Sequence, residues 1–368
     1  MRIFLLLVVM LAPSLVGAAP PSQERWPARE WAVAEPSAAV DKARLDSILD
    51  AAVTDGETTR AVVVVEDGAI IAERYAPGYD AHTRFFSYSM AKSFVATFVG
   101  ILAGEGRLDL GAPAPVPEWA APDDPRRAIR LSDLLHMSSG LWSNEDYRDP
   151  ASDTSTMLFG VGRDDVAHHA ADRPLKYQPG RFFKYSNGTS NILSGIVGRA
   201  LGGTEDGYRR FMHDALFGPL DMRSVVAGFD AKGNFVGSSL ISATARDYAR
   251  FGLLYQRDGR WRDRRILPEA WVRFARTPAP ASNGLYGAHF WLGPSRASIA
   301  RDPGVREAWP EDAFSARGLW GQIIAISPSR RLVLVILGNT QSLPQAEQDA
   351  HDRLAGELFS TVSAGAGE

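Results

Sequence analysis

Residues 85–100 read FFSYSMAKSFVATFVG, in which a serine and a lysine stand three positions apart before an apolar run. Residues with this spacing share one face of a helix, so we expect Lys92 Nζ to approach Ser89 Oγ. The chain has 40 lysines and arginines, of which only five are lysines. Arginine stays charged in proteins, whereas a buried lysine can lose its proton and act as a base. The stretch therefore predicts a serine that is activated by a neighbouring lysine.

The apolar run predicts a buried helix over residues 93–108, with Gly104 and Gly106 suited to its C-terminal end. Burial would lower the pKa of Lys92 from about 10.4 toward neutrality. The free backbone N–H groups at the start of this helix can also stabilise an oxyanion. An N-cap serine followed by a surface lysine gives the same S-x-x-K pattern, so other motifs must decide between the two interpretations.

The composition is that of a globular protein of one large domain or two ordinary ones, with 368 residues, 45% hydrophobic and 23% charged. A formal net charge of −3 gives no argument for binding nucleic acid or an anionic membrane. The chain has no cysteine, which excludes disulfides and thiolate metal sites. His136 and the pair His168–His169 lack carboxylates at a metal-binding spacing, and we expect no metal and no cofactor.

The first 18 residues have the pattern of a secretory signal peptide. Arg2 precedes an apolar run over residues 3–11, and small residues lead to a cleavage site near Ala18. A membrane anchor is the alternative, but the run falls short of the roughly 20 apolar residues that span a bilayer. We therefore expect a periplasmic or secreted protein with no stable membrane anchor after cleavage, in which residues 19–37 form an N-terminal surface segment.

Two β-hairpins lie near opposite ends of the chain. β-branched residues surround Glu66-Asp67-Gly68 in residues 61–75, and a second pair of apolar runs surrounds Ser327-Pro328-Ser329 in residues 321–339. Between the hairpins the patterns are mostly helical, as in residues 190–203 and 243–259. Further helices are expected over residues 38–53 and 343–362.

This order of elements predicts an α+β fold interrupted by a helical domain. We expect a sheet domain formed by residues 38–88 and 285–362, and a mainly helical domain over residues 89–284.

A second polar motif is Tyr185-Ser186-Asn187, which follows the turn Pro179-Gly180. A phenol can relay protons, and an amide can hold a carbonyl or another polar side chain. A tyrosine at a strand edge beside a turn-forming asparagine would explain the same residues without catalysis.

A third motif is Leu319-Trp320-Gly321, immediately before Gln322. A glycine that enters a strand permits close approach by a ligand, and the N–H of Gln322 could then bind an oxyanion. The alternative is that these residues only begin a strand, with Trp320 as a packed aromatic side chain.

S-x-x-K, then Y-S-N, then a small-residue strand motif, in that order, resembles the serine β-lactamase and penicillin-binding-protein superfamily. The tyrosine of the second motif points to its class C-like branch. Several phrases are most similar to the 6-aminohexanoate-dimer hydrolase and carboxylesterase subgroup, and the resemblance runs from about residue 40 to residue 340. These phrases are VVVEDGAIIAERYAPGYD (63–80), LSDLLHMSSGLW (131–142), PGRFFKYSNGTSNILSGIVGRALG (179–202) and TARDYARFGLLYQRDGRW (244–261).

The resemblance implies a central antiparallel sheet flanked by helices, an all-helical domain beside it, and an active site between them. By position, Ser89 would be the acylated nucleophile, Lys92 its base, and Tyr185 the group that passes a proton to the leaving group. The remaining implied roles are substrate binding by Asn187, Trp320 and Gly321, and an oxyanion hole formed by the N–H groups of Ser89 and Gln322.

One departure from the superfamily bears on the substrate. Where lactamases and DD-peptidases carry Lys or His, then Thr or Ser, then Gly, this chain reads Leu319-Trp320-Gly321. The change removes a cation and a hydroxyl that would hold a substrate carboxylate, although Arg317 could restore a charge. The sequence therefore favours small-molecule esters or simple amides over lactams.

Two other readings stay open at this point: a true β-lactamase or DD-peptidase, and a non-catalytic penicillin-binding-like sensor. The sequence does not indicate the oligomeric state.

Overall fold

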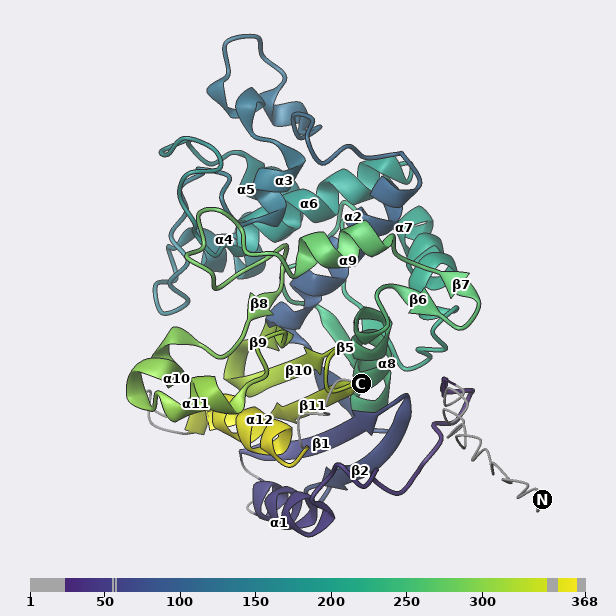
Figure 1. Cartoon of the computed structure of the whole chain (residues 1–368). Coiled ribbons are helices and arrows are strands. Elements are labelled where there is room, and N and C mark those ends of the chain that lie inside the picture. The colour runs from purple at the N-terminus through teal and green to yellow at the C-terminus, as the bar shows by residue number, and fades with distance from the viewer. Residues whose placement is uncertain (1–23, 55, 57, 343–349, 363–368) are drawn as a thin grey trace, which may run out of the picture.

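The computed structural model describes residues 24–54, 56, 58–342 and 350–362. Figure 1 shows a sheet with its flanking helices in the lower half and a cluster of helices in the upper half. The expected signal peptide (1–18) and the expected start of the last helix lie outside the described residues. Within the described part of the chain, no helix is long and apolar enough to cross a membrane.

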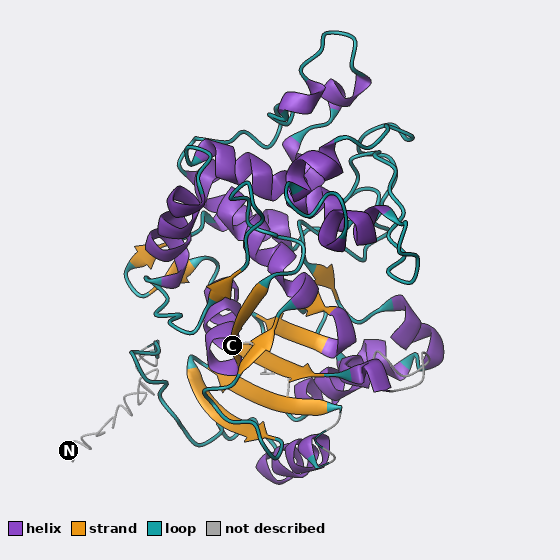
Figure 2. Cartoon of the chain, turned by 180° about the vertical axis from the view of Figure 1, so that it is seen from behind, coloured by secondary structure: helices purple, strands orange, loops and turns teal. Residues whose placement is uncertain are grey.

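The main sheet is antiparallel and six-stranded, which confirms the expected α+β class (Figure 2). Both predicted hairpins are present, as β1–β2 and β10–β11, and β1 pairs with β11 to bring the two ends of the chain together. In spatial order the strands are β2 (Ala69–Tyr75), β1 (Thr59–Glu66), β11 (Leu332–Gly338), β10 (Gln322–Ser327), β9 (Phe314–Gly318) and β8 (Trp291–Leu292).

Alternating side chains of the sheet supply two separate cores. On one face, Val62 and Val64 pack with the helices α1 (Lys42–Val53) and α12 (Ala350–Ser360). On the other face, Val63 and Val65 join a larger core shared with the helical half. Helices on both faces bury the sheet, so its two central strands are apolar along most of their length.

One helix that we expected in the helical domain lies against the sheet. Gly252 of α8 (Ala245–Gln256) packs so closely that an added Cβ would lie 2.4 Å from Val333 and 2.9 Å from Ile324. Helical spacing alone does not indicate which surface a helix covers, so the sequence pattern did not show that α8 packs on the sheet. The division at residue 284 stays a prediction.

The centre of the helical half is α2 (Ala91–Gly104), which ends at the predicted Gly104. Its residues from Ala91 to Leu102 are all buried. Gly100 allows the indole of Trp271 to pack directly on the helix, since an added Cβ would lie 2.4 Å from that ring. This burial on every side explains why the helix sequence is apolar on nearly every face.

The remaining α-helices and strands complete the helical half and two small sheets, except for α10 (Arg296–Arg301) and α11 (Gly304–Ala308), which lie beside α12 in the sheet half (Figure 1). The others are α3 (Leu131–Leu135), α4 (Asp153–Phe159), α5 (Val166–Ala171), α6 (Asn187–Ala200), α7 (Glu205–Met212), α9 (Glu269–Ala275), β3 (Arg84–Phe86), β4 (Val226–Ala227), β5 (Ile241–Thr244), β6 (Arg260–Trp261) and β7 (Arg264–Arg265).

Candidate active site

The predicted serine and lysine meet at the start of α2. Ser89 lies in the 3₁₀ turn η1 (Tyr88–Met90) that leads directly into the helix, and Lys92 Nζ is 2.9 Å from Ser89 Oγ. The residue before the serine, Tyr88, has a φ of 44°, a left-handed backbone that is unusual outside glycine. Ser89 is half-buried and lines a cleft, whereas Lys92 is 1% exposed. Ser89 is therefore accessible from the cleft, while Lys92 is not.

Three oxygen atoms surround the amine of Lys92. Its Nζ is 2.8 Å from Asn187 Oδ1 and 2.7 Å from the carbonyl oxygen of Ser238, both of which can only accept. A protonated Lys92 donates its third N–H to Ser89 Oγ. A neutral Lys92 donates to the other two acceptors and presents its lone pair to the hydroxyl proton of Ser89. Burial lowers the pKa of Lys92 to about 7, and the charge of Glu145 acts in the opposite direction. Lys92 can thus act as a base near neutral pH.

Asn187 is oriented by a carboxylate that the sequence gave us no reason to select. Its Nδ2 donates to Glu145 Oε2 at 2.9 Å, which leaves Oδ1 facing Lys92. The same carboxylate accepts from the backbone N–H of Asn187 and from the hydroxyls of Ser186 and Ser143. Glu145 therefore fixes the start of α6 and, through Asn187, the position of the base.

The carbonyl of Ser238 is held by the next turn of the same helix. Asn191, four residues after Asn187, accepts from the backbone N–H of Ser238 through its Oδ1 at 3.0 Å. The Asn187 and Asn191 side chains both lie on the buried face of α6. One helix face thus supplies one acceptor for Lys92 directly and positions the other.

Tyr185 lies beside the pair, as predicted from the Y-S-N motif. Its ring centroid is 5.1 Å from Lys92 Nζ, and it packs 5.3 Å from the ring of Trp291 and 6.0 Å from that of Tyr286. Burial raises the pKa of Tyr185 above its usual range, and a hydrogen bond with Ser89 acts in the opposite direction. The phenol therefore keeps its proton at neutral pH and can donate it.

The third motif occupies a different place from the one expected. The strand beside η1 is β9, which ends at Gly318, and an added Cβ there would lie 2.2 Å from the carbonyl oxygen of Ser87. The close approach to the nucleophile turn is therefore made by Gly318. An added Cβ on Gly321 would instead lie 2.3 Å from Nδ1 of His351, so the space beside this glycine is filled by a side chain.

Gln322 is also set back from the cleft. It is 2% exposed, its side-chain Nε2 donates to the carbonyl of Gly338 at 2.7 Å, and it pairs with Gly318 at the end of the β9–β10 ladder. Leu319 lies beyond that last pair and lines the cleft together with Trp320. The sequence contains two glycines at strand ends: Gly318 ends β9, and Gly321 immediately precedes β10. The sequence pattern did not distinguish them, and the prediction chose Gly321, three residues after the glycine that approaches Ser87.

Trp320 forms part of the cleft wall. Its ring packs edge-to-face with that of Tyr88 at 5.0 Å between centroids. The contact brings the turn after β9 against the turn that carries the nucleophile.

Arg317, the residue that could restore a positive charge at the third motif, is largely buried. It forms an ion pair with Asp352, which is 1% exposed, and donates to Gly293 O at 2.8 Å and Ser315 Oγ at 2.9 Å. Its side chain is 14% exposed. The cation nearest the third motif is therefore already bound within the protein.

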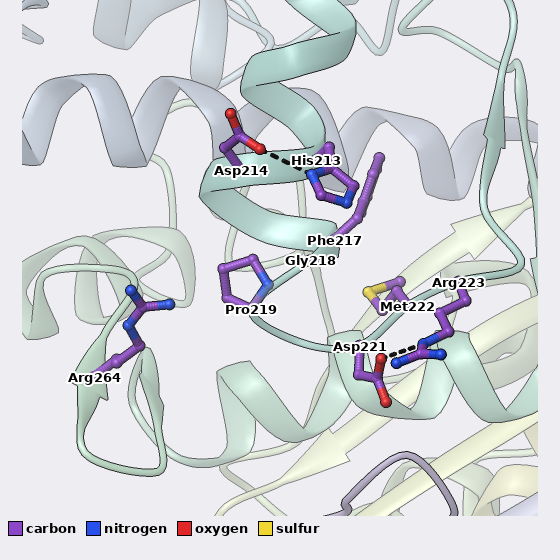
Figure 3. A pocket seen from close by; sticks show the side chains of 9 residues that line it. All are labelled: His213, Asp214, Phe217, Gly218, Pro219, Asp221, Met222, Arg223 and Arg264. Carbon is purple, nitrogen blue, oxygen red and sulfur yellow. Dashed lines mark hydrogen bonds and ion pairs between the residues drawn. The ribbon is translucent and has the colours of Figure 1, made fainter.

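These residues border a cleft of about 890 Å³ whose walls are largely apolar. A second pocket of about 640 Å³ lies at the turn after α7 and is drawn in Figure 3. There His213 pairs with Asp214, and Arg223 pairs with Asp221. The described residues that line this pocket include no serine, lysine or tyrosine, so the catalytic groups gather at the first cleft.

Comparisons with known proteins give matches over most of the chain. A family model described as beta-lactamase matches residues 45–358. The 6-aminohexanoate-dimer hydrolase of Paenarthrobacter ureafaciens is 27% identical over 307 residues, which cover 76% of this chain and 72% of that protein.

Solved structures show the same fold at lower identity. A family VIII carboxylesterase aligns with a TM-score of 0.66 at 15% identity, covering 89% of this chain and 99% of its own. A penicillin-binding-protein homologue from Caulobacter crescentus aligns with a TM-score of 0.64 at 18% identity, covering 89% and 98%.

Proposed function

The chain belongs to the β-lactamase family, and from that premise we propose that it is an exported serine hydrolase that cleaves esters or simple amides through an acyl-enzyme. One observation carries the proposal: Lys92 Nζ lies 2.9 Å from Ser89 Oγ in a buried site. Burial lowers the pKa of Lys92 to about 7, which suits the role of a base. A serine hydroxyl is a weak nucleophile until a neighbouring base accepts its proton.

Acylation then proceeds with Lys92 taking the Ser89 proton as Oγ bonds to the substrate carbonyl carbon. The bond from that carbon to the alcohol or amine breaks, and Tyr185 passes a proton to the departing atom, since its phenol is protonated and bonds to Ser89. Water then attacks the acyl carbon and gives a proton to the Tyr185 phenolate. The bond from that carbon to Ser89 Oγ breaks, the protonated Lys92 returns its proton to Oγ, and the acid is released. Lys92 and Tyr185 return to their starting protonation states.

The oxyanion hole in this proposal consists of the backbone N–H groups of Ser89 and Leu319. Leu319 follows the glycine that approaches the nucleophile turn and lines the cleft, whereas Gln322 is buried in the ladder. Removing one oxyanion donor costs on the order of 100-fold or more in other acyl hydrolases. Such a donor belongs to the backbone, so it is retained although Leu319-Trp320-Gly321 lack the cation and hydroxyl found in lactamases.

Export rests on the N-terminal pattern alone. The run at residues 3–11 behind Arg2 supports cleavage near Ala18 and a periplasmic or secreted product. N-terminal sequencing of the protein recovered outside the cytoplasm, with residues 3–11 interrupted by charges as a control, tests this part separately.

The β-lactamase or DD-peptidase alternative has one observation in its favour, the presence of Arg317 in the cleft wall. That arginine is bound to Asp352 and two further acceptors, which weakens the argument that it recognises a substrate carboxylate. The sensor alternative would need neither Lys92 nor Tyr185 in contact with the serine. Hydrolysis of a chromogenic cephalosporin distinguishes the first alternative from an esterase.

A fluorophosphonate probe tests the central claim. We expect the mature protein to be labelled on Ser89, located by peptide mass spectrometry, and the Ser89→Ala variant to remain unlabelled. Circular dichroism of both proteins establishes that they are folded. Absence of labelling on folded protein would make the non-catalytic sensor the better description.

A further inference from the structure

We propose that the cleft selects uncharged esters or amides with an extended apolar group, and that it rejects substrates with a free carboxylate or ammonium near the reacting bond. The inference deepens the proposed function and rests on it. It concerns which molecules reach Ser89, not whether Ser89 is activated.

Five charged side chains of the described residues line the cleft, and three of them are bound within the protein. These three are Glu145, Asp230 and Arg317, and we call the part of the cleft that they line the inner cleft. Glu145 accepts from Asn187, Ser186 and Ser143, as described above. Asp230, which is 8% exposed, accepts from three backbone N–H groups and from the amide of Asn234. Neither carboxylate can bind a substrate ammonium without first giving up these donors.

Arg317 is likewise bound within the protein, by Asp352 and two further acceptors. Turning its guanidinium toward a substrate carboxylate would leave the buried Asp352 without its ion-pair partner. Breaking a buried pair leaves an uncompensated charge, which is strongly unfavourable. A carboxylate in the inner cleft would therefore lose its hydration without gaining a cation.

One charged pair remains at the rim. Arg163 and Asp164 line the outer part of the cleft, where their side chains are 68% and 74% exposed and their closest atoms are 3.6 Å apart. Charges this exposed are screened by water and by each other. They give little recognition energy to an ion held close to Ser89.

Apolar surface, by contrast, is concentrated here. Ten large apolar side chains are exposed in the described residues, and half of them line this one cleft. Exposed apolar patches of this kind mark ligand grooves or interaction sites. The five side chains, with their exposed fractions, are Phe86 (60%), Tyr147 (47%), Phe159 (70%), Leu240 (39%) and Leu319 (43%).

The apolar walls come from both halves of the molecule. Leu319 and Trp320 follow β9 in the sheet half, while Leu158 and Phe159 end α4 in the helical half. Ser89 lies on the same cleft. A substrate that extends from the serine along these walls buries hydrocarbon, and each buried CH₂ favours binding by roughly 0.8 kcal/mol, or about fourfold in affinity.

This differs from what the curated relative's name implies. A 6-aminohexanoate dimer carries an ammonium at one end and a carboxylate at the other. The described inner cleft offers neither a carboxylate nor a guanidinium that is free to pair with them. We therefore expect this chain to prefer an uncharged amide of the same length to the dimer.

A matched pair of chromogenic esters tests the charge rule. We expect the mature enzyme to hydrolyse 4-nitrophenyl pentanoate with a kcat/KM on the order of 100-fold above that for the 4-nitrophenyl monoester of glutaric acid, because the latter ends in a carboxylate. Both acyl groups have five carbons. The rate of each ester without enzyme is subtracted, because the glutarate carboxylate can itself attack the ester carbonyl. Equal kcat/KM values after this subtraction would overturn the inference.

Acyl length tests the apolar walls. We expect kcat/KM to rise from the acetate to the octanoate ester, and Phe159→Ser to reduce the octanoate-to-acetate ratio by roughly three- to tenfold. Phe182→Ser is the matched control, since Phe182 is also exposed, at 41%, and does not line the cleft. An unchanged ratio in Phe159→Ser would contradict the assignment of this wall.

The failure of this inference is distinguishable from failure of the proposed function. Fluorophosphonate labelling of Ser89 with rapid turnover of the glutarate monoester would leave a serine hydrolase with a different substrate class. Absence of both labelling and ester turnover would overturn the two together.

Discussion

Two serine–base pairs lie close together in this molecule, and only one of them borders a cleft. Ser89 Oγ is 2.9 Å from Lys92 Nζ, and Ser190 Oγ is 3.0 Å from His289 Nε2. The second pair is sealed in the core, with exposures of 0% and 2%. The two are linked through α2, because the hydroxyl of Ser93 donates to the backbone carbonyl of His289.

The second pair has the hydrogen bonding of a catalytic dyad without access to a substrate. Nδ1 of His289 is 2.8 Å from the carbonyl oxygen of Leu135, which can only accept, so Nδ1 carries the proton. Nε2 then accepts from Ser190, as a general base would. Burial lowers the pKa of His289 to about 3, so the ring stays neutral at ordinary pH. The comparison teaches that activation requires an accessible serine as well as a correctly placed base.

The role of the sealed pair is therefore structural. His289 connects α2, α3 and α6 to the segment that leads into β8, and Trp291 two residues later packs on Tyr185. Its backbone φ of 61° is a left-handed conformation held by these bonds. In the proposed mechanism the first pair performs the chemistry, and the second holds the wall against which Tyr185 rests.

The largest effect that separates the two pairs is expected from Lys92→Arg. Arginine keeps the charge and cannot act as a base at neutral pH, so kcat/KM for a neutral ester should fall by about 1,000-fold or more. Ser190→Ala is the matched control and should retain most of the activity. Steady-state kinetics on folded proteins decides the matter, and near-normal turnover by Lys92→Arg would remove the lysine from the mechanism.

The free energy of unfolding should depend on pH because burial lowers the pKa of Lys92. Between pH 7 and about 10, Lys92 is largely neutral in the folded protein and protonated in the unfolded chain. The unfolded state then binds more protons, so raising the pH favours folding, by at most about 1.4 kcal/mol per pH unit.

Lys92→Met lacks this titration and provides the reference. We expect the free energy of unfolding of the wild type, relative to Lys92→Met, to rise with pH across this window in urea titrations. A difference that stays constant from pH 7 to 10 would mean that the folded-state pKa is close to its ordinary value.

His289 should affect stability more than chemistry. His289→Leu leaves the Leu135 carbonyl and the Ser190 hydroxyl without their partner, which we expect to lower the free energy of unfolding by about 2–3 kcal/mol. His289→Asn should lose less, because asparagine tolerates left-handed backbone and its amide can donate. Chemical denaturation measures both changes. Fluorophosphonate labelling of Ser190 in the wild type would show instead that this pair is accessible.

The sequence predicted contacts between residues that are close together in the chain. It did not predict contacts between residues that only the tertiary fold brings together. The contact between Ser89 and Lys92 could be predicted from their helical spacing, and both hairpins from their turn residues. Glu145 could not be selected, because it lies in an irregular loop 42 residues before the Asn187 that it orients, with no pattern to connect them. Gly318 was missed because its close approach to Ser87 depends on how β9 docks beside α2, which spacing does not encode.

Glu145→Gln gives the smallest expected effect and tests that missed connection. The carboxylate favours the charged form of Lys92, so its removal should lower the pKa of the lysine further and move the acid limb of kcat/KM to lower pH, by less than about one unit. Glu118→Gln, which removes the same charge from an exposed pair with His168, should leave the limb in place. The pH profile of ester hydrolysis measures the shift for each variant. A limb that moves to higher pH in Glu145→Gln would mean that the carboxylate acts on Lys92 mainly by orienting Asn187, because a misplaced amide would no longer support the neutral amine.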